Sequence, residues 1–483
     1  MRTPITFVLD GKIVAVNCRE SGISPTTTVL NYLRSLPHHA GVKEGCAEGD
    51  CGACTVVLGE LSGEGIRYRA VDSCLIFLPM LHGKQLITVE NLKTPAGDLH
   101  PVQQAMVERY GSQCGFCTPG VVMSLFALYK NCIHPTEAEV RRSLAGNLCR
   151  CTGYTPIVEA AMLACGPGRA KEISGDDAQL VALLRGIRAG SAVFADDRQT
   201  YYRPATVAEA LDLKQLHPEV VVTNGATDVA LRVTKNHEIL PVVLDLSGID
   251  SLRGWSEADG EVIVGAGTSI EDFAELCGER FPALAAMLGV FGSLQIRNLA
   301  TVGGNIGTAS PVGDLMPVLI AHEARIVLRG RRGERCVPAS QFVTGYRRTD
   351  VASDELITAV VLPPVHRGTI LRSYKVSRRQ DVDIATVSGG FRIELEDSGR
   401  ISTVILAYGG MADRVRRAER AEAFLRGKEW SRPTVEEAMH VLDTDFDPIS
   451  DVRGSAVMRK LAARNLLLKF WAESGVNGGE PWQ

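Results

Sequence analysis

The stretch Gly-Cys-Ala-Glu-Gly-Asp-Cys-Gly-Ala-Cys at residues 45–54 decides how the first part of this chain folds. Its three cysteines and a fourth farther along are spaced C-x4-C-x2-C-x19-C, and they are Cys46, Cys51, Cys54 and Cys74. A second set, spaced C-x2-C and C-x-C, consists of Cys114, Cys117, Cys149 and Cys151. Four thiolates are a complete ligand set for one metal centre, so the eight cysteines predict two such centres.

The first cysteine set lies in a loop of small residues. Glycine or alanine fills five of the ten positions from Gly45 to Cys54, and such residues let a backbone wrap closely around a metal centre. The spacing is typical of a plant-type [2Fe–2S] site. A four-cysteine zinc site is the alternative, and the interleaved glycines favour iron and sulfur over zinc.

The second set is ambiguous by itself, because a CxxC pair with a CxC pair can also bind zinc. Its flanks are SQCGFCTPG at residues 112–120 and AGNLCRCTGY at residues 145–154. Each flank places a cysteine pair at a predicted helix boundary, with Gly, Thr or Pro just outside. Gln113 directly precedes this set, and a residue at that position can also simply form hydrogen bonds at the end of a helix.

Composition and charge argue against several classes of protein. The 483 residues are 45% hydrophobic and 22% charged, with a formal net charge of −4, as in a globular chain of about three or four domains. No Lys/Arg-rich tract suggests nucleic-acid binding, and no apolar run is long enough to cross a membrane. The N-terminus has no apolar signal segment. We therefore expect a cytoplasmic protein, in which clustered cysteines bind metals rather than form disulfides.

The remaining cysteines stand singly in apolar or mixed surroundings. We expect them to be buried structural thiols, and they are Cys18, Cys132, Cys165, Cys277 and Cys336.

The part of the chain that contains the two cysteine sets shows two kinds of sequence pattern. Residues 5–18 alternate apolar and polar side chains around Asp10-Gly11, which predicts a β-hairpin. A short helix at 27–36, the first cysteine loop and a strand at 55–61 follow. From about residue 95 the pattern becomes helical, with predicted helices at 101–110, 119–131, 136–146 and 155–164. Residues 166–197 are polar and Gly-rich at both ends, which predicts a linker holding one short helix.

Beyond Tyr201 strands and helices alternate, and around residue 367 the pattern changes again. Predicted strands at 220–224, 241–246, 262–268 and 324–330 are interleaved with helices at 208–216 and 269–279. Strands at 370–376, 389–397 and 402–410 then precede helices near the C-terminus. The segment VGAGTSI at 264–270 resembles a dinucleotide fingerprint, but it lacks the last glycine, so we do not count it as one.

Two Gly-rich turns are candidate phosphate-binding sites. The first is VTNGATDV at residues 222–229, and the second is TVGGN at 301–305, which leads to Asp314. A diphosphate needs several convergent backbone N–H groups, and only small residues let the backbone approach it. An ordinary strand-to-helix turn is the alternative for each of them taken alone.

These motifs together resemble one family, the molybdenum hydroxylases, which include xanthine dehydrogenases and aldehyde oxidoreductases. Residues 1 to about 165 match the family in order, through GVKEGCAEGDCGACTVVLG, SQCGFCTPG and LAGNLCRCTGY. The resemblance implies that the four cysteines of each set bind one [2Fe–2S] cluster. It also implies that Gln113 lies close to the pterin of a molybdopterin cofactor.

The second half resembles the FAD domain of the same family, through NGATD near residue 225 and IRNLATVGGNIGTASPVGDLMP near residue 300. The resemblance implies that the two Gly-rich turns surround the FAD diphosphate and that single residues farther along contact other parts of the flavin. The implied FAD contacts are Val222, Thr223, Asn224, Gly225, Ala226, Thr227, Asp228, Val229, Phe291, Thr301, Val302, Gly303, Gly304, Asn305, Asp314, Ile357 and Lys375. The family's usual leucine is isoleucine at position 357.

The loop at residues 377–386, SRRQDVDIAT, matches the family's mobile acidic loop beside the flavin, which helps to decide whether NAD⁺ or oxygen is the acceptor. Val382 stands where an acidic residue is usual in animal members, so the loop alone does not decide for NAD⁺. Arg378 and Arg379 are also compatible with a solvated charged turn.

The resemblance implies a multidomain α+β fold. Its parts are a β-grasp [2Fe–2S] ferredoxin-like domain, a four-helix-type [2Fe–2S] domain, an α+β FAD-binding domain of the vanillyl-alcohol-oxidase/PCMH type, and a C-terminal α/β flavoprotein domain like that of CO dehydrogenase. The expected boundaries are 1–90, 91–165, a linker at 166–197, then 198–366 and 367–483.

The implied function is that of the iron–sulfur/FAD small subunit of a bacterial xanthine dehydrogenase. Hypoxanthine and xanthine would be hydroxylated at molybdopterin on a large partner subunit, in an α2β2 heterotetramer. Electrons would pass through the two [2Fe–2S] clusters and FAD to NAD⁺, and no residue of this chain would act in the hydroxylation itself. The alternatives are the equivalent subunit of another molybdenum hydroxylase, acting on an aldehyde, nicotinate or carbon monoxide, and a non-catalytic electron carrier.

Overall fold

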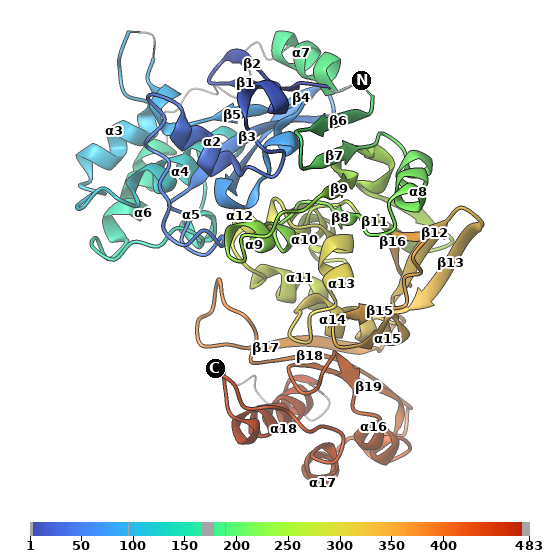
Figure 1. Cartoon of the computed structure of the whole chain (residues 1–483). Helices are drawn as coiled ribbons and strands as arrows, with labels where there is room; N and C mark the ends of the chain where they lie inside the picture. Colours follow the sequence, from blue (N-terminus) through green and yellow to red (C-terminus); the bar gives the residue numbers. More distant parts are fainter. Residues whose placement is uncertain (1–2, 95, 167–177, 189, 476–483) are drawn as a thin grey trace. The chain divides into compact units, whose positions relative to one another are not determined.

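The computed structural model of the chain describes residues 3–94, 96–166, 178–188 and 190–475 (Figure 1). The chain divides into two compact units. The first comprises residues 1–250 with 292–300, and the second comprises residues 251–291 with 301–483.

The first unit begins with a five-stranded sheet in the order β2-β1-β5-β3-β4. Asp10 and Gly11 form the predicted hairpin turn with φ of 49° and 80°, the left-handed values that a two-residue hairpin turn requires. The predicted helix begins after the cap residue Thr28 and packs its buried face on the sheet. The elements are β1 (Ile5–Leu9), β2 (Lys12–Val16), α1 (Cys18–Ser21), α2 (Val29–Ser35), β3 (Thr55–Ser62), β4 (Gly65–Asp72) and β5 (Gln85–Ile87), with 3-10 turns at Ser73–Leu75, Leu78–Leu81 and Val89–Leu92.

Four helices follow, as the sequence predicts: α3 (Pro101–Glu108), α4 (Thr118–Asn131), α5 (Glu137–Leu144) and α6 (Thr155–Ala164). Proline lies in the first turn of α3, α4 and α6, where its missing N–H costs no hydrogen bond. Thr136 and Glu139 form a capping box at the start of α5. The apolar faces of these helices share one core with side chains of β3 and β4.

The stretch predicted as a linker, residues 166–197, contains the expected helix and also a strand. Residues 167–177 lie outside the described residues, and the expected short helix is α7 (Ala178–Arg188). The end of the stretch is a strand and not a linker, because β6 (Ala192–Ala195) pairs with β7 (Thr200–Arg203). Backbone pairing in a sheet satisfies the amides that a linker would leave to water.

The second sheet of the first unit has the order β6-β7-β9-β8. Strands β7, β8 (Val221–Thr223) and β9 (Val242–Asp245) are parallel, and parallel neighbours need crossover connections. Helices α8 (Val207–Leu216) and α9 (Val229–Thr234) lie in these connections. The separate segment of this unit, residues 292–300, contains the short helix α12 (Leu294–Arg297).

The second unit begins with an antiparallel sheet in the order β10-β11-β16-β12-β13. Its strands are β10 (Trp255–Ala258), β11 (Glu261–Gly265), β12 (Arg325–Gly330), β13 (Gly333–Pro338) and β16 (Glu355–Leu362), and a small pair is formed by β14 (Val343–Gly345) and β15 (Arg348–Thr349). The helices of this part are α10 (Ile270–Cys277), α11 (Pro282–Gly289), α13 (Val302–Thr308), α14 (Leu315–Ala321) and α15 (Ala339–Phe342).

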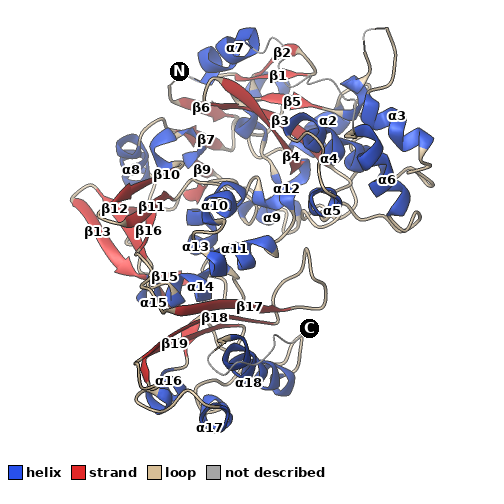
Figure 2. Cartoon of the chain, turned by 180° about the vertical axis from the view of Figure 1, so that it is seen from behind, coloured by secondary structure: helices blue, strands red, loops and turns tan. Residues whose placement is uncertain are grey.

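The last sheet follows the order β17-β18-β19-β20 and is antiparallel throughout. Its strands are β17 (Ile370–Val376), β18 (Val387–Leu395), β19 (Ile401–Gly409) and β20 (Arg416–Arg417), followed by α16 (Glu419–Leu425), α17 (Arg432–Leu442) and α18 (Ala456–Glu473). Helix α14 packs on one face of this sheet and α18 on the other (Figure 2). The expected α/β class for this part is therefore wrong: consecutive strands joined by short connections are antiparallel, and helices gathered after the strands make the part α+β.

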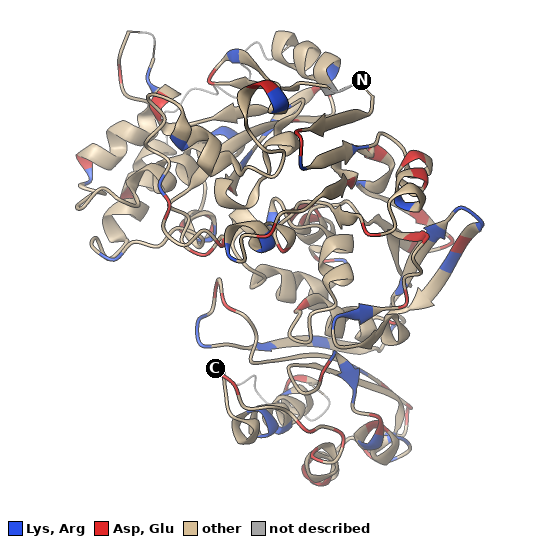
Figure 3. Ribbon diagram, in the orientation of Figure 1, with Lys and Arg blue, Asp and Glu red and all other residues tan. Residues whose placement is uncertain are grey.

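Lys and Arg residues and Asp and Glu residues are interspersed along the ribbon of both units (Figure 3), and the formal net charge is only −4. Within the part of the chain that the structure describes, no helix is long and apolar enough to cross a bilayer.

The expectation for the single cysteines is confirmed for three of them and wrong for a fourth. Cys18, Cys165 and Cys277 are buried, Cys132 is half-buried, and Cys336 is exposed. Cys336 lies on β13, which is an edge strand with few neighbours to cover it.

Candidate redox cofactor sites

The first cysteine set lies in the loop between α2 and β3 and in the turn that follows β4. Cys54 and Cys74 are buried, whereas Cys46 and Cys51 are half-buried. The Sγ atom of Cys46 accepts hydrogen bonds from the backbone N–H groups of Glu48 at 3.4 Å and Asp50 at 3.3 Å. Such N–H···S bonds stabilise a thiolate and tune the potential of a cluster bound to it.

The thiols of this set contact one another in pairs. Cys46 is hydrogen-bonded to Cys51 and Cys74, and Cys74 is hydrogen-bonded to Cys54. The bonds from Cys51 and Cys74 lower the pKa of Cys46, while the bond to Cys46 raises the pKa of Cys51 and of Cys74. These opposite shifts follow from four thiols that compete for negative charge in one small volume.

Glycines make this crowding possible at two points of the loop. A Cβ at Gly45 would lie 2.8 Å from Cys51 Sγ, and a Cβ at Gly52 would lie 2.2 Å from the backbone oxygen of Gly146. Gly52 also has a φ of 65°, which side chains disfavour. The small residues of the motif are therefore required by the packing of the loop itself.

The second set lies at the ends of helices α4 and α6. Cys114 and Cys151 are exposed, Cys117 is half-buried and Cys149 is buried. The thiols again form pairs, Cys114 with Cys151 and Cys117 with Cys149. Burial and then the bond to Cys149 raise the pKa of Cys117 to about 12.

Cys149 of the second set makes two polar contacts with the residues that follow it. Its backbone N–H donates to Tyr154 Oη at 2.8 Å, and its Sγ lies 3.1 Å from Thr152 Oγ1. Tyr154 has a φ of 67°. The segment after Cys149 is therefore folded back on this cysteine.

Each set provides four thiols, which are the ligands that an iron–sulfur cluster requires. Among the residues that the structure describes, no group of three or more His, Cys, Asp or Glu side chains is arranged to hold a metal ion. The thiols of the first set contact one another as a chain, from Cys51 through Cys46 and Cys74 to Cys54, and the thiols of the second set form two pairs. A [2Fe–2S] cluster takes four cysteines over two irons, so the two pairs of the second set fit it better than they fit one tetrahedral zinc ion.

The loops of the two sets touch directly. The backbone N–H of Leu148 donates to the carbonyl oxygen of Cys51 at 3.0 Å. The side-chain amide of Asn147 donates to Gly52 O at 3.0 Å. A direct backbone bond thus joins a cysteine of the first set to the residue before Cys149.

Gln113 is exposed in the loop between α3 and α4, next to the exposed Cys114. A neighbouring bond between Ser112 Oγ and Thr118 Oγ1, at 2.7 Å, closes this loop at the start of α4. The glutamine is therefore accessible to a molecule that approaches the second set from solvent.

The first Gly-rich turn, residues 222–229, joins β8 to α9 in the first unit. Gly225 has a φ of 85°, and a Cβ on it would lie 1.9 Å from Leu299 O. Only glycine fits there. Thr223 is buried, and its Oγ1 has no hydrogen-bond partner among the described residues. The turn thus presents a buried hydroxyl that a polar ligand would satisfy.

The second Gly-rich turn, residues 301–305, opens helix α13 in the second unit. Thr301 caps the helix, since its Oγ1 accepts the N–H of Gly304 at 3.1 Å. Gly303 is buried, and its Cβ would lie 2.6 Å from Ala266 Cβ, whereas Gly304 is exposed. Gly303 is therefore needed for packing, while Gly304 leaves the outer surface of the turn open to a ligand.

The other predicted flavin contacts of the second unit include a buried ion pair. Lys375 Nζ lies 2.7 Å from Asp314 Oδ2 and also donates to Val290 O at 3.0 Å. Burial raises the pKa of Asp314, and the Lys375 charge opposes this shift. Asp314 Oδ1 and Asn305 Oδ1 are buried without a partner among the described residues. These atoms can accept hydrogen bonds from the hydroxyl groups of a sugar or ribityl chain.

Phe291 and Ile357 are both half-buried. Ile357 lies on β16 next to helix α13, because a Cβ on Gly307 would lie 3.3 Å from its Cδ1.

The loop at residues 377–386 is closed by its own acidic residue. Asp383 Oδ2 accepts the backbone N–H groups of Arg378 at 3.0 Å and Arg379 at 2.9 Å. Partial burial raises the pKa of Asp383, but these hydrogen bonds and the Arg379 charge outweigh it, so the pKa is lowered. Val382 has a φ of 51° and is buried.

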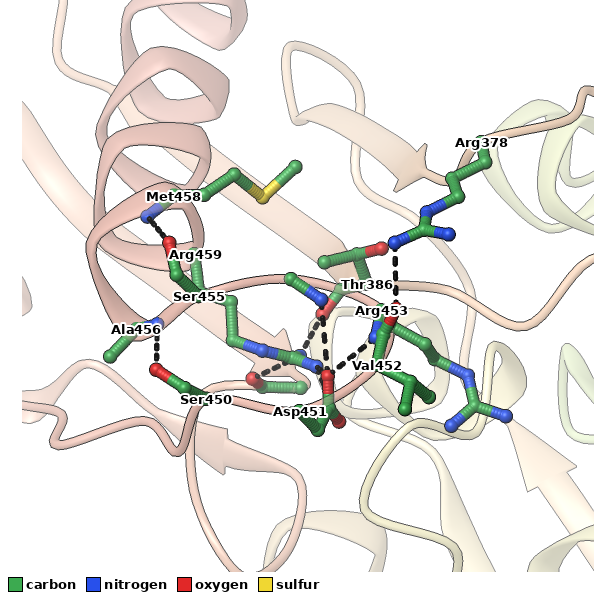
Figure 4. Close-up of polar contacts among 12 residues, drawn as sticks. Arg378, Thr386, Ser450, Asp451, Val452, Arg453, Ser455, Ala456, Met458 and Arg459 are labelled. Atoms are coloured by element: carbon green, nitrogen blue, oxygen red, sulfur yellow. Dashed lines mark hydrogen bonds and ion pairs between the residues drawn. The ribbon is translucent and has the colours of Figure 1, made fainter.

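A buried arginine fixes the end of this loop to helix α18 (Figure 4). Arg459 is 1% exposed and forms a two-pronged ion pair with Asp451, with both contacts at 2.8 Å. It also donates to the carbonyl oxygens of Thr386 and Gly410. Arg378 donates to Val452 O at 2.6 Å in the same region. Val452 thus holds the start of the loop, and Arg459, paired with Asp451, holds its end.

We expect Arg459→Met to lower the free energy of unfolding by about 3 kcal/mol, because it removes the buried cation that donates to Asp451 and to the carbonyl oxygens of Thr386 and Gly410. Urea unfolding followed by tryptophan fluorescence measures this, since Trp430 and Trp471 belong to the same core as α18. The matched control is Arg464→Met on the same helix. Arg464 pairs with Asp443 at a partly exposed site, so we expect it to cost less than about 1 kcal/mol. Equal losses would contradict the role given to Arg459.

Three family models match consecutive parts of the chain. Residues 88–162 match a "[2Fe-2S] binding domain", residues 194–365 match an "FAD binding domain in molybdopterin dehydrogenase", and residues 372–474 match a "CO dehydrogenase flavoprotein C-terminal domain". The chain belongs to the molybdenum hydroxylases. It is the electron-transferring iron–sulfur and flavin portion of such an enzyme.

Comparison with individual molybdenum hydroxylases shows which share of their length this chain spans. It is 34% identical to a xanthine dehydrogenase of Emericella nidulans and 29% identical to a xanthine dehydrogenase/oxidase of Gallus gallus, each over 97% of this chain. It spans only 38% and 40% of the length of these relatives. Among solved structures, a chain of a carbon monoxide dehydrogenase from Hydrogenophaga pseudoflava matches 56% of this chain and 94% of its own length, with 29% identity and a TM-score of 0.53.

Some residues near these sites were not predicted from the sequence, because they belong to none of the motifs quoted above. The turn at 265–269, which we did not count as a dinucleotide fingerprint, lies against the second Gly-rich turn: Gly303 N–H donates to Ala266 O at 2.8 Å, and Val302 N–H donates to Thr268 O at 3.0 Å. The glycines of this turn, Gly265 and Gly267, could have indicated such a close backbone contact from the sequence. Ser124, Asn147 and Gln295 form a buried network beside the cysteine loops, and polar residues in otherwise apolar helices were the only hint of it.

Proposed function

We propose that this chain passes electrons from the oxidation of hypoxanthine and xanthine, at a molybdopterin centre on a large partner subunit, through two [2Fe–2S] clusters and FAD to NAD⁺. The observation that carries the proposal is the pair of four-thiol sets joined by the bond from Leu148 N–H to Cys51 O. Each set provides the ligands of one cluster, and an FAD-binding sequence follows in the same chain. We assign the cluster domains to the β-grasp and four-helix types and the flavin domain to the vanillyl-alcohol-oxidase/PCMH type.

The exposure of the cysteines supports the order of transfer. Cys114 and Cys151 of the second set are exposed, and Gln113 is exposed beside them. Two cysteines of the first set are buried. The second set is therefore the one that a partner carrying the electron source can approach, and the first set lies one step farther along the relay.

An apolar surface around the second set supports a partner subunit. Hydrophobic side chains close in sequence to the cysteines of the second set are exposed, and they are Tyr110, Phe116 and Leu148. Apolar side chains gathered around a functional site are typical of a protein–protein interface. We propose that the molybdopterin-bearing subunit covers this surface, in an α2β2 assembly.

From the sequence resemblance we propose, as FAD contacts, the Gly-rich turn of each unit, together with Asp314 and Lys375 of the second unit. FAD takes electrons singly from iron–sulfur clusters and delivers them as a pair, as a hydride acceptor such as NAD⁺ requires. In the second unit the chain supplies exposed backbone at Gly304 and two oxygens, of Asn305 and Asp314, that have no partner among the described residues.

A second candidate is the equivalent portion of a molybdenum hydroxylase with another substrate. The similarity to a carbon monoxide dehydrogenase chain favours it. A stand-alone electron carrier is less well supported, because it gives no role to the apolar surface around Cys114 and Cys151.

Purification with the native partner, followed by metal, flavin and pterin analysis, tests the proposal. We expect both cluster types, FAD and molybdopterin in the complex, and rapid NADH formation from xanthine and NAD⁺. Carbon monoxide, nicotinate and an aldehyde serve as competing substrates in the same assay. Slow reduction of NAD⁺ with fast transfer to oxygen or ferredoxin would point to another acceptor, and turnover of a competing substrate alone would replace xanthine.

A further inference from the structure

The short segment at residues 292–300 contacts both cysteine loops. It lies within the range of the FAD-binding family match, yet it belongs to the first compact unit. A Cβ on Gly49 of the first loop would lie 2.7 Å from Ile296 Cδ1, and a Cβ on Gly146, just before the second loop, would lie 2.2 Å from Gln295 Oε1. Asn298 Nδ2 donates to Ala70 O at 2.8 Å. The segment is thus built into the iron–sulfur part of the protein.

Gln295 is the buried centre of these contacts. Its side chain is fully buried. Its Nε2 atom lies 2.8 Å from Ser124 Oγ, 3.0 Å from Asn147 Oδ1 and 3.2 Å from Ser143 O. Ser124 Oγ in turn donates to Asn147 Oδ1 at 2.6 Å. The amide group of Gln295 therefore joins α4, the end of α5 and the loop that carries Cys149.

Asn147, which Gln295 contacts, in turn bonds to the first cysteine loop. Its Oδ1 atom is occupied by Ser124 and Gln295, which orients its Nδ2 toward Gly52 O at 3.0 Å and Thr55 Oγ1 at 3.2 Å. The next residue, Leu148, makes the backbone bond to Cys51 O. Without Gln295, the buried Asn147 amide would lose one of the partners that fix its orientation.

We propose that Gln295 is a positioning residue for electron transfer: it orients Asn147 and thereby holds the two cluster loops at a fixed separation. The inference rests on the proposed function, in which each loop binds one [2Fe–2S] cluster. Electron transfer and magnetic coupling between two clusters both fall steeply with their distance. A small loosening of this contact therefore changes the relay without removing either cluster.

Gln295→Leu in the full-length holoprotein tests the proposal, because leucine fills the space and removes the donors. We expect unchanged iron, sulfide and flavin contents, but loss or narrowing of the spin–spin splitting between the clusters in the fully reduced protein, and slower electron exchange between them. Ser124→Ala removes only the bridging hydroxyl and should shift the splitting in the same direction. If the leucine variant does not assemble its clusters, the splitting measured in Ser124→Ala tests the proposal instead.

Gln199→Leu is the control, since Gln199 is another buried amide of the first unit, bonded to Thr26 and Leu240 rather than to Asn147. It should leave the splitting unchanged. A wild-type splitting and exchange rate in Gln295→Leu, with both clusters present, would overturn the proposal. Fewer than two [2Fe–2S] signals in the wild-type protein would instead refute the cluster assignment, which separates the two failures.

Discussion

Cys149→Ser should remove one of the two [2Fe–2S] clusters and stop electron flow toward FAD. Cys149 is buried, contacts Cys117, and is supported by Thr152 and Tyr154. A hydroxyl at this position is a poor ligand for iron beside three thiolates, so the second cluster should not survive purification. Electron paramagnetic resonance of the reduced protein should then show one [2Fe–2S] signal in place of two, with about half of the iron.

Cys165→Ser is the matched control for this variant. Cys165 is also buried, shares the helical core with Cys149 and belongs to neither set. We expect it to keep both signals and full iron content. Two intact cluster signals in Cys149→Ser would show that the assignment of this ligand is wrong, whereas loss of a signal in both variants would point to damage of the helical fold.

Local rules account for most of what the sequence predicted correctly. The hairpin at Asp10-Gly11, the capping box at Thr136 and Glu139, and the prolines that open three helices each depend on neighbours within a few residues. The cysteine sets depend on spacing as well, and their flanks carried the family resemblance. These features need no knowledge of the distant chain, which is why sequence patterns reveal them.

Distant contacts account for what was missed. Gln295 bonds to Ser124 and Asn147 across 171 and 148 residues, and no spacing rule reports such a pair. Strand β6 has only four residues and gains its pairing from β7 and the sheet beyond it. The C-terminal sheet was assigned to the wrong class because its strands read alike whether they pair parallel or antiparallel. Pairing direction is a tertiary property, and alternation along one strand does not encode it.

Gly304→Val should prevent the protein from retaining FAD. Gly304 is exposed in the first turn of α13, and its backbone is the open part of the second Gly-rich turn. Two methyl groups there would stand where a diphosphate must approach the backbone N–H groups. We expect the purified variant to lack most of the flavin absorbance while both [2Fe–2S] signals persist, because the cysteine sets belong to the other compact unit.

The change in helix propensity from glycine to valine must be separated from this effect. Gly289→Val is the control, because Gly289 is an exposed helical glycine of the same unit whose Cβ would meet no atom within 4 Å. Both variants carry the same change in helix propensity, which is below about 1 kcal/mol, so only a site-specific clash distinguishes them. Full flavin absorbance in Gly304→Val would exclude this turn from the diphosphate site. Equal flavin loss in Gly289→Val would mean that FAD retention follows the stability of the unit rather than access to Gly304.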